Sequence, residues 1–242
     1  MSLDNSFIDI NCDLGEIDPS LNLEKSIMPL IDRCNIASGG HAGDRASIQG
    51  TILLAQEHEV KIGIHPSYDD PLNFGRVRLK ISNHDLMDSL RKQIDLFKEI
   101  ATQENVEIDH IKAHGALYHY LSEDEEMVHL YLDSIQQNHP ELKVMIPPYS
   151  VISRLAKEYS LNVIHEAFAD RKYQTDRKLV SRQIEGSVLK DPDEVVKQVN
   201  SLVKDGGVYI DETFVGIQAE SICVHSDTEN SIEILKAIRA HC

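Results

Sequence analysis

Residues 110–118 read HIKAHGALY, and their first five positions decide how the chain folds. The alternation is typical of a β-strand that carries His110, Lys112 and His114 on one face and apolar side chains on the other. A row of ionisable groups is ordinary where it meets water, but it is costly in the protein interior unless the groups are paired or functional. The fold therefore decides whether this row is surface or site.

Segments of the same kind recur along the 242-residue chain, and helical patterns usually follow them. The expected strands cover residues 7–13, 33–37, 60–65, 109–114, 142–146, 162–166 and 221–224. Apolar residues between them follow the spacing of one helix face, as in Leu86, Leu90, Ile94 and Phe97. The expected helix N-caps are Asp44, Ser82, Asp191 and Asp227. Residues 206–218 have the pattern of an inserted hairpin.

Strands that alternate with helices imply right-handed crossovers and a parallel sheet whose two faces are both covered. This pattern predicts an α/β fold with a single domain over residues 1–242. With about seven strands, the sheet can close into a (β/α) barrel smaller than the eight-stranded form. An open doubly wound sheet is the alternative. In a sheet covered on both faces, the row at His110 faces away from bulk water.

Composition argues against two classes of partner. The net charge of −16 and the absence of Trp disfavour nucleic-acid binding, which needs a basic stripe and stacking platforms. No segment is apolar and long enough to cross a bilayer, and the first ten residues lack the basic start of a signal peptide, so we expect a cytoplasmic protein.

The four cysteines, Cys12, Cys34, Cys223 and Cys242, lack CxxC spacing and are expected to be buried free thiols.

The parity seen at His110 recurs in other expected strands, with one polar and one apolar face each. The polar faces carry Asp9, Asn11 and Asp13; Arg33 and Asn35; Lys61, Gly63 and His65; and His225 and Asp227. Inside a barrel, such groups are tolerable if they pair, bind an ion or surround a polar ligand. A paired structural network is the alternative for the deeper positions, Asp9, Arg33, Lys61 and His110. At the carboxyl ends of the strands, where parallel α/β folds bind ligands, we favour a functional site.

Polar loops follow several of these strand ends. Residues 39–44, GGHAGD, place three glycines and His41 before an expected helix, where backbone N–H groups can meet an anion. Residues 65–70, HPSYDD, and 73–76, NFGR, form a long connection that can cover the site. Residues 166–173, EAFADRKY, add two acids and an arginine.

Together these motifs resemble the LamB/YcsF family. The matching runs, in family order, are DINCDLGE (9–16), NIASGGHAGD (35–44), GIHPSYDD with NFGR (63–76), IKAHGALY (111–118), EAFADRKY (166–173), LVSR (179–182) and SICVHSDT (221–228). The resemblance implies a distorted, TIM-like barrel of the glycoside hydrolase/deacetylase type. It also implies an ATP-hydrolysing 5-oxoprolinase subunit that opens 5-oxo-L-proline to L-glutamate together with two partner subunits, B and C.

For that reaction, phosphorylation of the amide oxygen by ATP would make the lactam open to attack by water, and the site must supply cations or N–H donors and a base. The candidate catalytic residues are Asp13, His41, His65, Lys112, His114 and Asp227. The candidate substrate-binding residues are Asn11, Glu16, Asn35, Gly39, Gly40, Gly43, Asp44, Arg76, Glu166, Asp170, Arg171 and His225. Lys112, helped by Arg171 and the glycine turn, is the candidate for the phosphate or oxyanion, and Asp13 or Asp227 for the base.

The chain has no GxxxxGK[ST] loop, so ATP must be recognised in another way or mainly by a partner subunit. Two other functions remain open. Asp13, His41, His65 and His114 could bind a divalent metal for hydrolytic deacetylation. The chain could also be a non-catalytic binding subunit, which a fully self-paired interior would favour.

Overall fold

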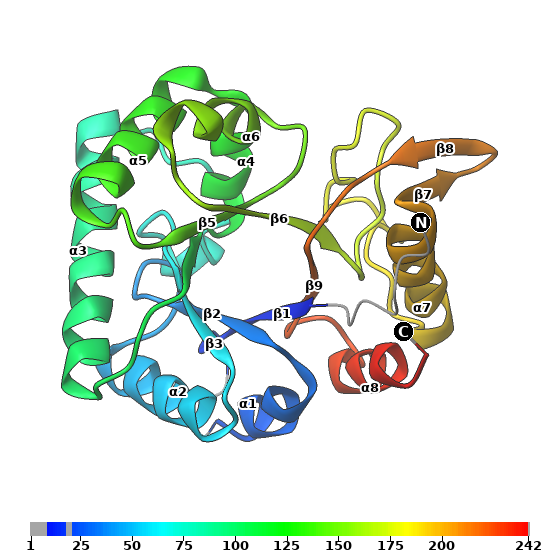
Figure 1. The fold of residues 1–242 in the computed structure, drawn as a ribbon, viewed down its shortest axis with the longest axis horizontal. Helices are drawn as coiled ribbons and strands as arrows, with labels where there is room; N and C mark the ends of the chain where they lie inside the picture. The colour runs from blue at the N-terminus through cyan, green and yellow to red at the C-terminus, as the bar shows by residue number, and fades with distance from the viewer. Residues whose placement is uncertain (1–8, 18–20, 242) are drawn as a thin grey trace.

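The computed structural model describes residues 9–17 and 21–241, and its centre is a closed barrel of parallel strands (Figure 1). The barrel strands, in spatial order, are β1 (Asp9–Leu14), β2 (Arg33–Ala37), β3 (Lys61–His65), β4 (His110–Lys112), β5 (Lys143–Ile146), β6 (Val163–Phe168) and β9 (Ser221–His225). The last strand, β9, pairs with both β1 and β6 and closes the sheet. The predicted seven-stranded barrel is confirmed, and the open-sheet alternative is wrong.

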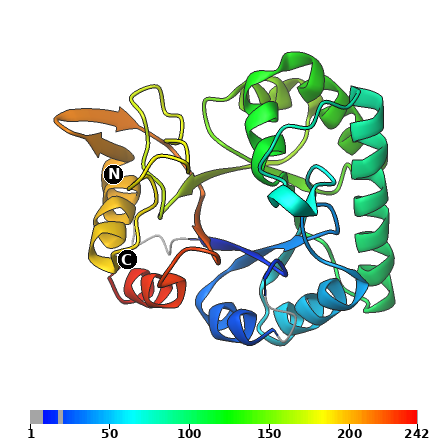
Figure 2. The ribbon, with the colours of Figure 1, turned by 180° about the vertical axis from the view of Figure 1, so that it is seen from behind.

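Helices surround this barrel in both views (Figures 1 and 2). They are α1 (Asn22–Ile27), α2 (Arg45–Glu57), α3 (Asn83–Gln103), α4 (Gly115–Glu123), α5 (Glu125–Asn138), α6 (Val151–Leu155), α7 (Pro192–Asn200) and α8 (Ser231–His241). Shorter helical turns are η1 (Met28–Leu30), η2 (Pro71–Asn73), η3 (Ala156–Tyr159) and the π-helical η4 (Ser201–Asp205). None of the helices in the described ranges is both long and apolar enough to cross a membrane.

The hydrophobic core lies between the strands and these helices. Strand residues such as Ile10, Ile36 and Ile111 are fully buried, and helix residues such as Ile52 and Phe97 belong to the same cluster. Because successive side chains of a strand point to opposite faces, the residues between these apolar positions point into the barrel. The polar rows predicted from the sequence therefore line the interior.

Residues 33–37 form a strand with the expected bounds, and the other six strands differ from the expected bounds by one or two residues at one or both ends. The described part of β1 begins at Asp9, and residues 7 and 8 lie outside the described ranges. Strand β4 ends at Lys112, because the backbone of His114 already occupies the N-cap position of α4. Within β3, the register places Gly63 beside His110, and a Cβ atom at Gly63 would lie 2.2 Å from His110 Nε2. Glycine is therefore required there to admit the imidazole ring.

A paired layer occupies the amino-terminal end of the barrel. Arg33 Nε lies 2.9 Å from Asp9 Oδ2, the Arg33 guanidinium also pairs with Asp109, and Lys143 Nζ lies 2.6 Å from Asp109 Oδ1. This layer matches the structural network that we considered for the deeper positions. Lys61 is the exception, because its side chain is exposed rather than part of the interior.

The predicted helix N-caps are confirmed at three of the four positions. Asp44, Ser82 and Asp191 each accept a backbone N–H at the start of α2, α3 and α7. The N-cap predicted at Asp227 is wrong, because α8 begins at Ser231 and the Asp227 carboxylate pairs with two arginines instead.

Two further predictions concern the hairpin and the cysteines. The hairpin is confirmed, since β7 (Gly207–Ile210) and β8 (Thr213–Gly216) pair antiparallel. Figures 1 and 2 show it projecting beyond α7. Cys12, Cys34 and Cys223 are buried and free, as predicted, and Cys242 lies outside the described ranges.

Candidate active site

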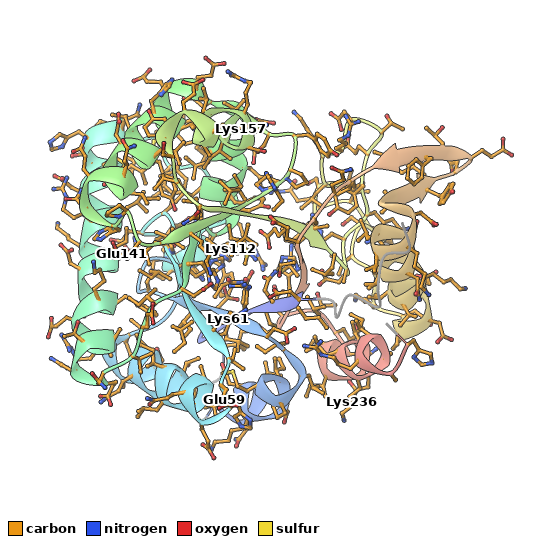
Figure 3. All side chains as sticks on the ribbon, viewed as in Figure 1. Glu59, Lys61, Lys112, Glu141, Lys157 and Lys236 are labelled. Carbon is orange, nitrogen blue, oxygen red and sulfur yellow. The ribbon has the colours of Figure 1, made fainter. Side chains whose placement is uncertain are left out.

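Lys112 lies at the centre of the barrel interior and is 2% exposed (Figure 3). Its Nζ lies 2.8 Å from Asp13 Oδ1, 3.1 Å from Glu166 Oε2 and 3.2 Å from Cys223 Sγ. Burial by itself would lower the pKa of Lys112, but the charge of Asp13 and its neighbours outweighs burial and raises that pKa well above its usual value. The ammonium is therefore held between two carboxylates.

Asp13 carries the complementary charge. Burial opposes its ionisation, yet His65 and Lys112 outweigh burial and hold the pKa of Asp13 well below its usual range. The amide of Asn35 donates to Asp13 Oδ1 at 2.7 Å and to Asn11 Oδ1 at 2.8 Å. His110 Nε2 lies 2.7 Å from Asn35 Oδ1 and fixes the orientation of that amide. Asp13 is thus an ionised carboxylate held by hydrogen bonds from Asn35 and Lys112.

Three histidines and Glu16 form a second cluster above Lys112. His41 Nε2 lies 2.8 Å from Glu16 Oε1, and His114 Nδ1 lies 3.4 Å from the same oxygen. The His41 and His114 rings stack with their centroids 3.6 Å apart, and His65 Nε2 lies 3.0 Å from His114 Nδ1. Burial lowers the pKa of both His41 and His114, which favours neutral rings.

The connection between β3 and α3 covers this cluster through contacts of Ser67 and Phe74. Figure 2 shows the backbone of this connection in cyan. It supplies the Phe74 carbonyl that contacts His114 Nε2 at 3.0 Å and the Ser67 hydroxyl that contacts His41 Nδ1 at 2.9 Å. The cluster is therefore closed from above by backbone and hydroxyl groups of residues 66–76.

An oriented aspartate and histidine pair lies at the ends of β6 and β9. Asp170 is fully buried, and its Oδ1 lies 2.9 Å from His225 Nδ1. Burial would raise the pKa of Asp170, but His225 and a hydrogen bond from Thr228 lower it. A ring nitrogen of His225 also lies within 4.8 Å of Asp13 and Cys223 ligand atoms, so the pair faces the Lys112 centre.

Arginines surround the mouth of the barrel on the same side. Asp227 pairs with Arg76 and with Arg182, whose Nη1 lies 3.2 Å from the carboxylate. Arg171 is 4% exposed, donates to the Val180 carbonyl at 2.6 Å, and has an Nε with no hydrogen-bond partner among the described residues. Burial, together with the charge of Arg182, lowers the pKa of Arg171 to about 10. Three arginines thus lie near two acids, Asp227 and the buried Asp170, and this excess of positive charge makes the mouth attractive to an anion.

Known proteins place this barrel in a family. A model described as the LamB/YcsF family matches residues 8–242. The chain belongs to the LamB/YcsF family. It is 39% identical over 237 residues to a protein of Acinetobacter baumannii (strain ACICU) named as the A subunit of 5-oxoprolinase, covering 97% of this chain and 93% of that protein. A protein of Pyrococcus abyssi with the same name is 37% identical over 235 residues, covering 96% and 92%.

Solved structures agree. A lactam utilization protein from Thermus thermophilus is 28% identical and superimposes with a TM-score of 0.87 over 97% of this chain and 95% of that one. A putative cellobiose-phosphate cleavage protein from Enterococcus faecalis V583 is 11% identical, with a TM-score of 0.58 over 97% and 94%, and shows the shared fold alone.

In this LamB/YcsF chain the interior brings together most of the residues that we selected from the sequence. They are Asn11, Asp13, Glu16, Asn35, His41, His65, Lys112, His114, Glu166, Asp170 and His225. Arg76, Arg171 and Asp227 lie at the mouth instead. Asp44 lies apart from both groups, because its side chain is exposed and caps α2.

The glycine turn before α2 has a structural task. Gly39 and Gly43 have positive φ, and the Gly39 N–H donates to the Ala42 carbonyl within the turn. Gly40 packs so tightly that a Cβ there would lie 2.4 Å from Ser67 Oγ. The turn thereby holds His41 against Ser67.

Two site residues were missed. Cys223 was interpreted as a packing thiol, although strand parity places it on the same face as His225, and this signal could have identified it. Arg182 ends the LVSR run of the family resemblance but was not selected, and its irregular segment has no periodicity that would place it beside Asp227.

Proposed function

We propose that this chain is the A subunit of an ATP-dependent 5-oxoprolinase, which opens 5-oxo-L-proline to L-glutamate together with partner subunits B and C. The observation that carries the proposal is a buried group in which Lys112 lies between the Asp13 and Glu166 carboxyl groups, beside an oriented His225–Asp170 pair, in a chain whose relatives bear that name over nearly their full length. The substrate is an anionic cyclic amide, and the site offers matching features.

The mouth arginines suit the substrate carboxylate. A guanidinium can bind a carboxylate through two parallel hydrogen bonds, and Arg171 has a buried Nε without a partner among the described residues. With the carboxylate held by Arg171 and Arg182, the lactam ring extends toward Asp13 and His225. This places the reacting carbonyl between the two groups of ionisable side chains.

Lys112 has a narrower role than the sequence indicated. An ammonium has three N–H donors, and Asp13, Glu166 and Cys223 already lie within 3.2 Å of Nζ. In our proposal Lys112 keeps Asp13 ionised and in place and does not itself stabilise the oxyanion.

The chemistry divides into three steps. The amide oxygen attacks the γ-phosphorus of ATP, and ADP leaves. Water then adds to the activated carbon and gives a proton to His225, which Asp170 orients; the carbon–nitrogen bond breaks as the nitrogen takes a proton, leaving γ-glutamyl phosphate. A second water releases phosphate and L-glutamate. Recognition of ATP is assigned mainly to the partner subunits, since the chain lacks a P-loop motif.

The proposal is tested by mixing the chain with subunits B and C and following L-glutamate and ADP from 5-oxoproline. The complete mixture should turn over, and Asp13→Asn, which keeps the side-chain volume, should lower kcat by about 10²-fold to 10³-fold, because the negative charge that Lys112 holds beside the reacting carbonyl is lost. The matched control is Asp133→Asn, on the exposed face of α5, which should retain normal turnover. Absence of glutamate from the complete mixture would overturn the assignment, and a normal rate for Asp13→Asn would favour a non-catalytic binding subunit.

A metal-dependent, deacetylase-like hydrolase is the second candidate function. It is favoured by the Glu16, His41, His65 and His114 cluster, whose ligand atoms all lie within 4.8 Å of one another. An acetylated substrate that releases acetate in the absence of ATP and of subunits B and C would support this function over the first.

A further inference from the structure

Each histidine of the cluster above Lys112 has one ring nitrogen committed as a donor. His65 Nδ1 lies 2.7 Å from the Lys112 carbonyl, and His114 Nε2 lies 3.0 Å from the Phe74 carbonyl. A carbonyl oxygen can only accept, so both of these nitrogens carry a hydrogen. When a ring is neutral, its single hydrogen therefore lies on the nitrogen that faces the carbonyl.

His41 follows the same rule through a hydroxyl. The Ser67 hydroxyl donates its single hydrogen to the Tyr68 carbonyl at 2.8 Å, so its oxygen accepts from His41 Nδ1 at 2.9 Å. The other nitrogen of His41, Nε2, is then a lone pair in the neutral ring. That lone pair faces Glu16 Oε1 at 2.8 Å.

With the three rings neutral, three lone pairs and one carboxylate converge in a buried space. His65 Nε2 and His114 Nδ1 face each other at 3.0 Å, and these atoms lie 3.9 Å and 3.4 Å from Glu16 Oε1. Four electron-rich atoms that face one another repel unless a proton or a metal cation lies between them. The side chains of His65 and Glu16 are 1% and 4% exposed, so water screens this repulsion poorly.

We propose that Glu16, His41, His65 and His114 bind one divalent transition-metal ion of the Zn²⁺ class. Three imidazoles and one carboxylate are a ligand set that suits Zn²⁺ and disfavours Mg²⁺ or Ca²⁺, which prefer all-oxygen sites. Metal-binding histidines almost always donate their second ring N–H to a carbonyl or another acceptor, as all three rings do here. Glu16 takes the place that we gave to Asp13 in the sequence-based metal hypothesis.

The proposed metal site lies next to the Asp13–Lys112 pair of the barrel interior. His65 Nε2 lies 3.4 Å from Asp13 Oδ2, and Asp13 is held by Lys112. A bound metal would supply a Lewis acid next to that carboxylate. The proposal rests on the geometry of four side chains and does not depend on which reaction the protein performs.

The test is metal binding by the chain alone, purified without a histidine tag and stripped with a chelator. Titration calorimetry and elemental analysis with Zn²⁺ should show one ion per chain, and Co²⁺ should give the absorption of a tetrahedral site. His41→Ala should remove the binding, and Ser67→Ala, which deletes the acceptor behind His41, should weaken it by about 10-fold to 100-fold. His84→Ala, on an exposed position of α3, is the control and should bind normally.

Glu16→Gln guards against misfolding, because it removes the charge and keeps the volume. Circular dichroism should show all variants folded. Loss of Zn²⁺ affinity in folded Glu16→Gln supports the site. The proposal is overturned if the wild type, His41→Ala and Glu16→Gln bind Zn²⁺ with equal affinity. It is also overturned if neither the unstripped nor the reloaded protein binds an ion, and nitrogen NMR would then show a proton shared by His65 and His114. Since no turnover is measured, this outcome is independent of the 5-oxoprolinase proposal.

Discussion

Replacing Lys112 with methionine should strongly destabilise the folded chain while keeping the apolar length of the side chain. The change leaves Asp13 and Glu166 buried without the ammonium that lies 2.8 Å and 3.1 Å from their oxygens. No hydrogen bond of ordinary geometry reaches the Glu166 carboxylate among the described residues, so its compensation is electrostatic and comes from Lys112. The neighbouring Tyr118 hydroxyl is also buried and interacts with Glu166, but it carries no charge that could replace the ammonium.

The expected loss of unfolding free energy follows from what is known of buried ion pairs. Removing one partner of a buried ion pair costs about 3–5 kcal/mol, because an uncompensated charge remains in a medium of low polarity. For a chain of this size, such a loss lowers Tm by roughly 6–20 °C. Lys61→Met is the matched control: Lys61 is a strand lysine whose side chain is exposed, and its loss should change stability by less than about 0.5 kcal/mol.

The stability deficit of Lys112→Met should depend on pH, and the pKa of Asp13 decides in which direction. In the wild type the pKa of Asp13 lies well below its usual value, so its stabilising contribution is present at neutral pH and is lost as pH falls through that lowered pKa. Without Lys112, the buried Asp13 takes up a proton at higher pH. The difference in unfolding free energy between wild type and Lys112→Met should therefore shrink between about pH 7 and about pH 4.

The assay is urea unfolding followed by circular dichroism at several pH values. Adding Asp13→Asn and Glu166→Gln to Lys112→Met should restore most of the stability at pH 7, since no buried charge remains uncompensated. If Lys112→Met were no less stable than Lys61→Met, or if its deficit did not depend on pH, the reasoning about a charged, buried centre would be refuted.

Two further predictions concern catalysis in the mixture with subunits B and C. Asp170→Asn should lower kcat by about 10²-fold or more with little change in KM, because His225 loses the carboxylate that orients it. The variant should also alter the pH profile of kcat, and an unchanged profile would argue against His225 as the base. Arg182→Ala should raise KM for 5-oxoproline and leave slow turnover of 2-pyrrolidinone, which lacks the carboxylate, unchanged; equal effects on both substrates would exclude carboxylate binding at the mouth.

Much of the fold was predictable because its signals are local. Side-chain alternation in a strand is a backbone property, so the inward rows of Asp13, Lys112 and His225 could be recognised from parity alone. The N-cap at Asp44 is equally local, since its partner Ser47 is three residues away. The parallel sheet then required the polar rows to meet in one interior.

The rest depends on contacts between distant segments. Asp227 resembles an N-cap in sequence, yet it pairs with Arg76, 151 residues away, and with Arg182, 45 residues away. The hydrogens of His65 and His114 are fixed by main-chain carbonyls that neither sequence spacing nor residue type reveals. Roles that depend on such partners become visible when the three-dimensional structure is known.

The most direct test of the central claim is a crystal structure of the chain with 5-oxo-L-proline bound. We predict the carboxylate of the ligand against Arg171 and Arg182, and its lactam carbonyl within hydrogen-bond reach of the Asp13 and His225 side of the interior. A ligand seated elsewhere, for example in the 420 Å³ cavity lined by Gly39, Asp69 and residues of α3 such as Lys92, would contradict the account.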